Sequence, residues 1–136
     1  MIVARSETLP LLGDEDVLRA RQTVGAWMAD SRFTVLANTK MVTATSELAR
    51  NAVVHGGGGS ALLELLAAAG RTGMRLTVED SGPGIADIEQ AMSDGFSTGG
   101  SLGLGLGGSR RLAQEFEIWS EFGRGTRVSI TTWKQA

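Results

Sequence analysis

The sequence contains no cysteine and only one histidine, His55, among its 136 residues. The absence of cysteine excludes a disulfide scaffold, a thiolate metal site and a cysteine nucleophile. A single histidine argues against a multi-histidine zinc site, because such a site needs several nitrogen or sulfur ligands. The chemistry of this chain must therefore rest on other residue types.

An excess of basic residues is also missing. The chain has 13 Lys and Arg against 15 Asp and Glu, a formal net charge of −2, whereas a nucleic-acid-binding protein normally carries a basic excess. The longest apolar stretch, residues 62–69, is interrupted by Glu64 and is too short for a membrane helix. The opening residues MIVARSETLP lack the apolar segment of a signal peptide. We therefore expect a cytoplasmic protein with no nucleic-acid or membrane partner.

Glycine, in contrast, is abundant. It accounts for 19 of the 136 residues, roughly twice its usual share. The glycines cluster at 56–59, at 82 and 84, and densely between 95 and 108. Because glycine has no Cβ, its backbone can come close to a ligand. Three such clusters favour a bound small molecule, although ordinary tight turns use glycine as well.

The hydrophobic pattern predicts alternating strands and helices. We expect strands at 2–8, 62–69, 74–79, 117–121 and 126–133, and helices at 15–29, 39–55, 87–92 and 109–116, the last starting as early as Leu104. Asp14 is the expected N-cap of the first helix and Gly56 the expected C-cap of the second, while 70–73 and 123–125 are expected hairpin turns. The order predicts an α/β (α+β) sandwich in one domain, 1–136, whose mixed, mostly antiparallel sheet has helices on one face.

Three polar residues share one face of the second expected helix. Glu47, Asn51 and His55 are spaced four apart, so each projects one turn from the next. An amide oxygen can join the shell of a hydrated Mg²⁺ that also binds phosphates, and a carboxylate can take a proton from a hydroxyl or water. A solvated helix face carries the same residue types, so the spacing alone leaves both interpretations open.

Asp80 follows the expected strand 74–79 and precedes Gly82 and Gly84. A carboxylate held at the end of a strand can accept a hydrogen bond from an exocyclic amine, and the glycines would let a flat base lie against the backbone. A plain Asx-turn has the same sequence pattern. The segment is therefore a candidate base-binding turn, with the structural turn as the alternative.

Two familiar glycine motifs do not fit the segment 103–108. Its spacing formally matches G-x-G-x-x-G, but it follows a loop rather than a buried strand, so the dinucleotide-binding interpretation fails. A Walker A loop needs Gly-Lys-Ser/Thr, whereas Ser109 and Arg110 follow Gly108.

Four motifs, taken in their order along the chain, resemble the nucleotide-binding boxes of the GHKL ATPase superfamily, which includes gyrase, Hsp90, histidine kinases and MutL. They are Glu47-Leu-Ala-Arg-Asn51-Ala-Val-Val-His55, Asp80-Ser-Gly82-Pro-Gly84-Ile85, Gly103-Leu-Gly105-Leu and Gly123-Arg-Gly125-Thr126. The resemblance covers about residues 5–134. More narrowly, the run from 95 to 118 resembles the small bacterial serine kinases that regulate sigma factors by partner switching, in particular stressosome kinases.

One residue departs from that narrower pattern. Gly107 stands where this group is expected to have a proline, and a proline would pre-set the first turn of a helix. The resemblance therefore implies a looser ATP lid over 95–108 than in the relatives.

The resemblance implies a Bergerat-type ATP-binding fold with ATP and Mg²⁺ as cofactors. It implies that Glu47 is the general base or polarising carboxylate, that Asn51 is the Mg²⁺ ligand, and that Asp80 holds the adenine amine. The remaining implied nucleotide contacts are Gly82, Gly84, Ile85, Gly103, Leu104, Gly105 and Thr126.

Positive charge is scarce near these motifs. No Lys or Arg occurs between Leu76 and Ser109, so Mg²⁺, backbone N–H groups and a helix N-terminus would have to meet the charge of a triphosphate. The nearby cations are Arg50, Arg110 and Arg111. Solvated helix positions or partner contacts are the favoured explanation for at least two of these arginines.

The resemblance implies an ATP-dependent protein serine/threonine kinase that phosphorylates a STAS-domain antagonist in a partner-switching pathway. Its downstream regulator would be a phosphatase or a sigma-factor pathway protein. Two alternatives share the motifs: an anti-sigma factor that binds a sigma factor directly, and an ATP-gated binding module with little kinase activity. A histidine kinase is not expected, because no dimerisation helices with a phosphoacceptor histidine precede the motifs, and 136 residues cannot include the transducer domains of a gyrase-like machine.

Overall fold

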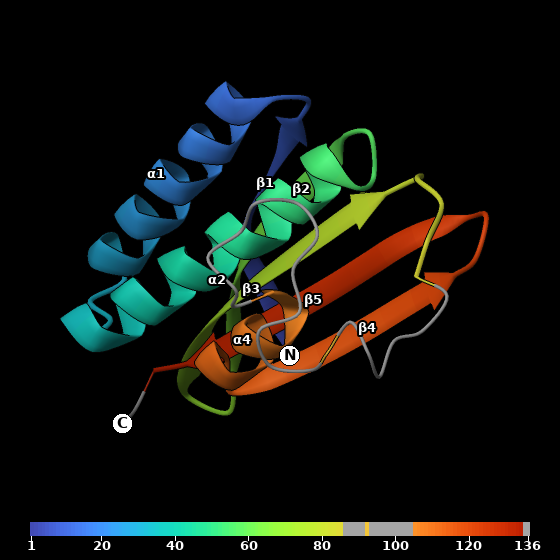
Figure 1. Ribbon diagram of the computed structural model, residues 1–136. Coiled ribbons are helices and arrows are strands. Elements are labelled where there is room, and N and C mark those ends of the chain that lie inside the picture. The colour runs from blue at the N-terminus through green and yellow to red at the C-terminus, as the bar shows by residue number, and fades with distance from the viewer. Residues whose placement is uncertain (86–91, 93–104, 135–136) are drawn as a thin grey trace.

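The structure is a computed structural model that describes residues 1–85, 92 and 105–134. In chain order its elements are β1 (Ile2–Leu11), α1 (Asp14–Asp30), α2 (Val35–Val54), β2 (Gly59–Ala68), β3 (Arg71–Asp80), α4 (Gly105–Leu112), β4 (Glu115–Glu121) and β5 (Gly125–Trp133) (Figure 1). The strands form one sheet in the order β1-β2-β3-β5-β4. Within the described residues every strand pairing is antiparallel, so the expectation of a mixed sheet is wrong in that detail.

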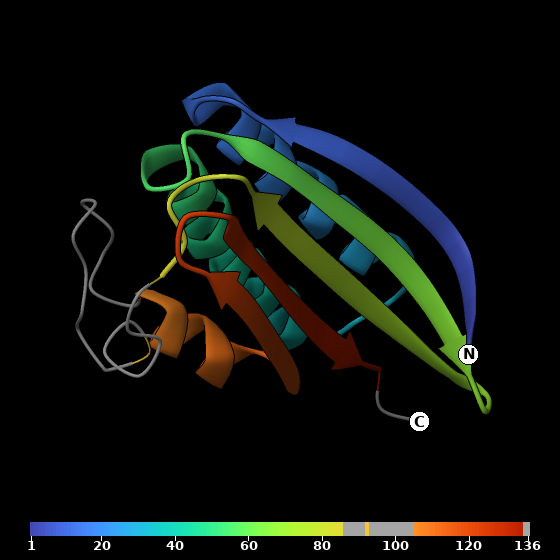
Figure 2. The ribbon, with the colours of Figure 1, turned by 90° about the vertical axis from the view of Figure 1, so that its right-hand side faces the viewer.

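Helices α1, α2 and α4 cover the same face of the sheet, as the sequence predicted (Figures 1 and 2). The core lies between these two layers, and its largest fully buried side chains include Leu11, Met28, Met41, Leu48, Leu63, Met74, Leu76 and Ile130. Helix α2 lies between α1 and α4 and also contacts β1, β2, β3 and β5. This central helix carries Glu47 and Asn51, so the sheet and both neighbouring helices hold those residues in place.

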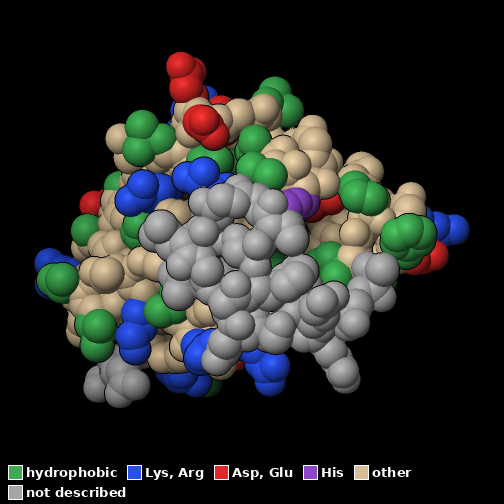
Figure 3. Space-filling view, viewed as in Figure 1, with side chains coloured by type: hydrophobic (Ala, Val, Ile, Leu, Met, Phe, Trp, Pro, Cys, Tyr) green, Lys and Arg blue, Asp and Glu red, His purple; other side chains and the backbone are tan. Residues whose placement is uncertain are grey.

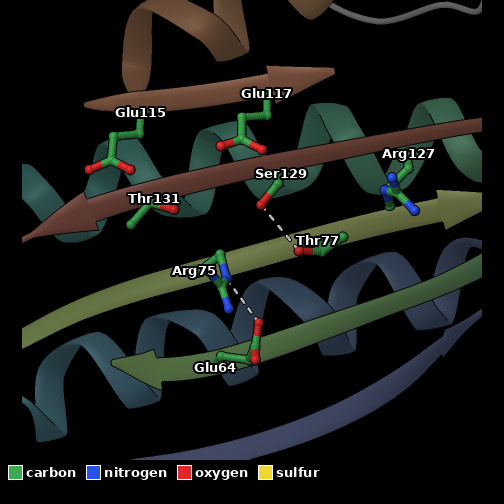
Figure 4. A pocket seen from close by; sticks show the side chains of 8 residues that line it. All are labelled: Glu64, Arg75, Thr77, Glu115, Glu117, Arg127, Ser129 and Thr131. Atoms are coloured by element: carbon green, nitrogen blue, oxygen red, sulfur yellow. Dashed lines mark hydrogen bonds and ion pairs between the residues drawn. The ribbon is translucent and has the colours of Figure 1, made fainter. Parts of the chain in front are cut away.

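The other face of the sheet is open and polar (Figure 4). A pocket of about 240 Å³ on this face is lined by Glu64, Arg75, Thr77, Glu115, Glu117, Arg127, Ser129 and Thr131. Arg75 Nε donates to Glu64 Oε1 at 2.9 Å, and the hydroxyls of Thr77 and Ser129 are 3.2 Å apart. Around this pocket the strands alternate between apolar residues under the helices and polar residues on the open side, which is the period-two pattern of a half-buried sheet.

Both long helices begin and end at positions other than those expected. The N-cap of α1 is Gly13 rather than Asp14, and the carboxylate of Asp16 accepts from Leu12 N at 2.8 Å. Helix α2 starts at Val35 instead of Thr39, because the Thr34 hydroxyl accepts from Ala37 N at 3.1 Å and caps the helix there. Its C-cap is His55, not Gly56.

The strands on the N-terminal side are longer than predicted. β1 continues from residue 8 to Leu11 and includes Pro10, which an edge strand tolerates because its proline nitrogen need not donate to a partner. β2 and β3 are joined by two residues, Ala69 and Gly70, instead of the expected turn at 70–73. Both have positive φ, 51° and 78°, as a type I′ hairpin turn requires.

The helix expected at 109–116 lies at Gly105–Leu112, and β4 already starts at Glu115. Phe116 and Ile118 pack against the core while Glu115 and Glu117 line the open face, so this segment follows a strand period rather than a helical one. Gly107 is the third residue of α4 and is buried. The expected helix at 87–92 and most of the proposed lid at 95–108 lie outside the described residues.

Candidate nucleotide-binding site

Glu47 is a buried acidic residue on α2, with only 5 % of its surface exposed. Its Oε2 has no hydrogen-bond partner, and it is the one buried side-chain oxygen or nitrogen of which this holds among the described residues. A buried carboxylate oxygen without a partner costs free energy. The site is therefore suited to a group that donates to this oxygen, such as a water or a substrate hydroxyl.

Asn51 lies one helical turn beyond Glu47 and is half-buried. Its backbone oxygen accepts from His55 N at 2.9 Å and from Gly56 N at 3.2 Å, where α2 ends. The imidazole of His55, the chain's single histidine, is exposed on the helical face of the molecule (purple in Figure 3). The three residues that the sequence placed on one helix face thus lie in the last two turns of α2 and its cap.

Asp80 is the last residue of β3, and backbone groups hold its carboxylate. Oδ1 accepts from Gly82 N at 3.0 Å, and the backbone N–H of Thr126 on β5 also bonds to this carboxyl. Burial raises the pKa of Asp80 above its ordinary value, while these two hydrogen bonds and the nearby charge of His55 oppose that rise. The carboxylate predicted to read an amine is therefore oriented before any ligand arrives.

The end of α2 and the turn after β3 touch through glycine. A Cβ on Gly56 would lie 2.3 Å from Asp80 Cγ, and a Cβ on Gly82 would lie 2.5 Å from Gly56 Cα. Any side chain at either position would push the end of α2 away from the turn that follows β3. Gly82 was predicted as a base contact, whereas Gly56 was missed as a site residue although it opens a run of four glycines.

Gly84 has a different neighbour. Its φ is +74°, and a Cβ there would lie 2.3 Å from Glu121 O at the end of β4. The residue therefore allows the 81–85 segment to pack against the β4–β5 turn, and Gly123 N donates to Pro83 O at this junction.

Ser120 ties the same segment to the end of β5. Its hydroxyl accepts from Ile85 N at 2.7 Å, donates to Gly125 O at 3.1 Å and lies 3.0 Å from Thr126 Oγ1. Thr126 in turn pairs with Asp80 across β3 and β5. The structure thus brings Ile85, Thr126 and Asp80 together, and it adds Ser120, which has no signal in the sequence beyond its place in an alternating strand.

The structure does not place the other predicted residues in this cluster. Gly103 and Leu104 lie outside the described residues, and Gly105 begins α4. Arg50 and Arg110 are exposed. Among the residues that the structure describes, no group of three or more His, Cys, Asp or Glu could hold a metal ion. None of the described helices is long and apolar enough to cross a membrane.

The sheet, the helical layer and the joined ends of α2, β3 and β5 define an ATPase fold of known type. Residues 37–136 match the model of the family described as histidine kinase-, DNA gyrase B-, and HSP90-like ATPase. The chain belongs to this family, which confirms the superfamily that the four motifs indicated.

Named relatives place the chain more narrowly. It is 39 % identical to the serine/threonine-protein kinase RsbT of Bacillus subtilis over 90 % of this chain and 92 % of that protein. It is 32 % identical to the anti-sigma F factor of Halalkalibacterium halodurans over 82 % of this chain and 80 % of that protein. These matches confirm the narrower resemblance to sigma-regulating serine kinases.

A solved structure supports the fold. The RsbU and RsbW domains of a Mycobacterium tuberculosis protein superpose with a TM-score of 0.66 at 21 % identity, over 98 % of this chain. This chain corresponds to 34 % of that longer chain.

Proposed function

We propose that this chain binds ATP with Mg²⁺ and transfers the γ-phosphate to a serine or threonine hydroxyl of a STAS-domain partner. The observation that carries the proposal is Glu47, buried on α2 with an unpartnered Oε2. Glu47 lies one helical turn before Asn51, and the side-chain amide oxygen of Asn51 is a suitable ligand for Mg²⁺. A proton acceptor beside a candidate cation ligand is the arrangement that phosphoryl transfer to a hydroxyl needs.

The residues present fit the nucleotide. Asp80, held by Gly82 and Thr126, would accept from the exocyclic amine of adenine, and the bare backbones of Gly56 and Gly82 leave no Cβ beside it. Ile85 and Thr126, joined through Ser120, would bound the base on the β5 side. Asn51 would hold the cation, whose shell phosphate oxygens and water complete.

Glu47 would act on the partner rather than on the nucleotide. Its carboxylate would accept the proton of the attacking hydroxyl while the new oxygen–phosphorus bond forms and ADP leaves. ATP would be the source of the phosphoryl group, and the Mg²⁺ that Asn51 would hold would offset negative charge during transfer. Help from a general base contributes on the order of 10²–10⁴-fold in rate, so the loss of Glu47 should reduce transfer far more than nucleotide binding.

The partner class rests on the relatives. Similarity to a serine/threonine-protein kinase and to anti-sigma F factors supports a partner-switching regulator. We propose that residues 1–136 form one domain. It would act in the cytoplasm, where ATP and sigma factors are found. The same anti-sigma relatives support a second candidate function, direct binding of a sigma factor controlled by nucleotide.

The test mixes the purified chain, γ-labelled ATP and a STAS-domain protein encoded in the same genome. We expect label on a serine or threonine of the partner, and we expect Glu47→Gln to lose most of that rate while its affinity for ATP stays within about twofold. Glu64→Gln is the matched control, since Glu64 is a partly buried carboxylate on the opposite face of the sheet. Absence of label together with tight binding to a sigma factor would replace the kinase proposal with the anti-sigma one.

A further inference from the structure

A second groove lies at the other end of α2, away from Glu47 and Asn51. Its volume is about 330 Å³, and its walls come from the α1–α2 connection, the first turns of α2, the end of α4 and the end of β5. Lys40 lines it and precedes Asn51 by 11 residues, which is about 16 Å along a helix. The groove is therefore a separate feature from the candidate nucleotide site.

The charge of this groove has one sign. Arg32, Lys40, Arg111 and Lys134 line it, and no acidic residue does so among its described lining residues. Figure 3 shows Lys and Arg side chains gathered on the lower left of the helical face, over the start of α2 and the end of β5. The chain as a whole carries a net charge of −2, so this local excess of positive charge is a feature of the groove and not of the composition.

The floor of the groove is apolar. Phe33, Ala37 and Leu112 line it, and Leu36 at its edge is 63 % exposed. A ligand that suits the groove must therefore combine negative charge with an apolar side chain.

Arg32, which lines the groove, has a backbone conformation that residues other than glycine rarely adopt. It has φ +61° and occupies the position after the C-cap of α1, where its N–H donates to Ala29 O and Phe33 N donates to Met28 O, both at 3.0 Å. This is a Schellman motif, in which glycine is the usual residue at the left-handed position. An arginine in this conformation lowers stability relative to glycine, which points to a use for its side chain.

We infer that this groove docks an acidic, amphipathic segment of a partner protein, with carboxylates beside the four cations and an apolar side chain on the floor of Phe33, Ala37 and Leu112. A nucleic acid would match the cations but not the apolar floor, and the net charge of the chain opposes it. The inference concerns protein binding and does not depend on kinase activity.

Binding is measured by fluorescence anisotropy with labelled 16-residue amphipathic peptides at low salt. One peptide carries leucines at helical spacing on a glutamate background, a second has lysine in place of glutamate, and a third has glutamate with no leucine. We expect the first to bind and to weaken as salt rises, the second not to bind, and the third to bind at least about tenfold more weakly, since it lacks the apolar contact. Equal or tighter binding of oligothymidylate would overturn the proposal in favour of nucleic acid.

Variants locate the binding on the chain. Arg32→Gly should raise the melting temperature by about 2–5 °C and yet weaken the acidic peptide roughly fivefold, with Lys40→Ala adding a similar loss. Arg19→Ala is the matched control, because it removes one positive charge from α1 at a residue that does not line the groove. The inference is wrong if the acidic peptide does not bind, or if its affinity is unchanged in Arg32→Gly/Lys40→Ala.

Discussion

Asp80 is the residue on which the assignment of the base depends. Changing Asp80 to Asn replaces half of its acceptor capacity with donors that would face the adenine amine. A mispaired polar group in a partly buried site costs about 1–3 kcal/mol, or roughly 5- to 150-fold in affinity. We expect calorimetry to show that loss for ATP.

The neighbouring carboxylate provides the control for this change. Glu79 precedes Asp80 on β3 and is exposed, so Glu79→Gln alters charge equally without touching the turn at Gly82. Equal affinity of Asp80→Asn and the unaltered chain for ATP would show that Asp80 does not hold the base.

The same carboxylate makes stability depend on pH. Burial, opposed by two backbone hydrogen bonds and by His55, raises the pKa of Asp80 above its ordinary value of 3.8. The folded chain then binds this proton more tightly than the unfolded chain, so stability falls as pH rises from about 3.8 through the raised pKa. Without nucleotide, Asp80→Asn should be at least as stable as the unaltered chain at pH 7, and the difference should shrink as pH falls toward 4.

Urea denaturation of both proteins between pH 4 and pH 7 measures this difference. A variant that is less stable at pH 7 would mean that the hydrogen bonds to Gly82 and Thr126 outweigh the cost of burying the charge.

Some of these site residues can be predicted from the sequence and others cannot. Glu47, Asn51 and Asp80 are predictable because helical spacing and the end of a strand place them, whereas Thr126 was predicted only through the family resemblance. Ser120 is not predictable, since its role depends on a contact with Ile85, 35 residues away along the chain. Gly56 was predicted only as a helix cap, whereas its lack of a Cβ matters for the approach of Asp80, which is a tertiary contact.

Among the elements, the β2–β3 hairpin contains a residue at odds with its backbone. Ala69 has φ 51° in the two-residue turn, a conformation that costs a residue with a Cβ about 1 kcal/mol or more. Asn tolerates it better, and Asn-Gly is the preferred pair in such turns. Ala69→Asn should therefore raise the free energy of unfolding by about 0.5–1 kcal/mol, as read from urea denaturation.

Ala67 provides the opposite change for comparison. It lies within β2 and is exposed, and Ala67→Gly should lower stability by roughly 0.5–1 kcal/mol, because glycine loses more backbone freedom on folding. A destabilising effect of Ala69→Asn would contradict the type I′ geometry.

Element types are predictable here more often than their ends. The first strand was expected to end at residue 8, yet β1 continues through Pro10 to Leu11, because it lies at the sheet edge, where the missing proline donor is not needed. The start of α2 was expected at Thr39, whereas the hydroxyl of Thr34 caps the helix and starts it at Val35. Glu115 and Phe116 fit a helix or a strand equally in isolation, and pairing with β5 decides the matter.

At the scale of the whole molecule, the candidate site joins segments far apart in the sequence. The ends of α2 and β3 meet at Gly56 and Gly82, and the β4–β5 turn reaches the 81–85 segment through Ser120. A ligand that contacts Asn51, Asp80 and Thr126 would therefore link two long elements to the C-terminal hairpin, and its binding should be measurable as stability of the entire fold.

Bound nucleotide should accordingly raise the melting temperature, and the size of the rise should depend on both the base and the metal-bound phosphates. At 100 times its dissociation constant, Mg·ATP should add about 2.7 kcal/mol, on the order of 10 °C in melting temperature for a chain of this length. GTP presents an acceptor where adenine has its amine, so it should raise the melting temperature much less. In Asp80→Asn most of the rise in melting temperature with Mg·ATP should be lost. In Asn51→Ala the rise should fall by the amount that EDTA removes from the unaltered chain. Equal shifts with ATP and GTP would contradict recognition of adenine by Asp80, and an ATP shift insensitive to both EDTA and Asn51→Ala would remove Asn51 from the metal site while leaving the base contact in place.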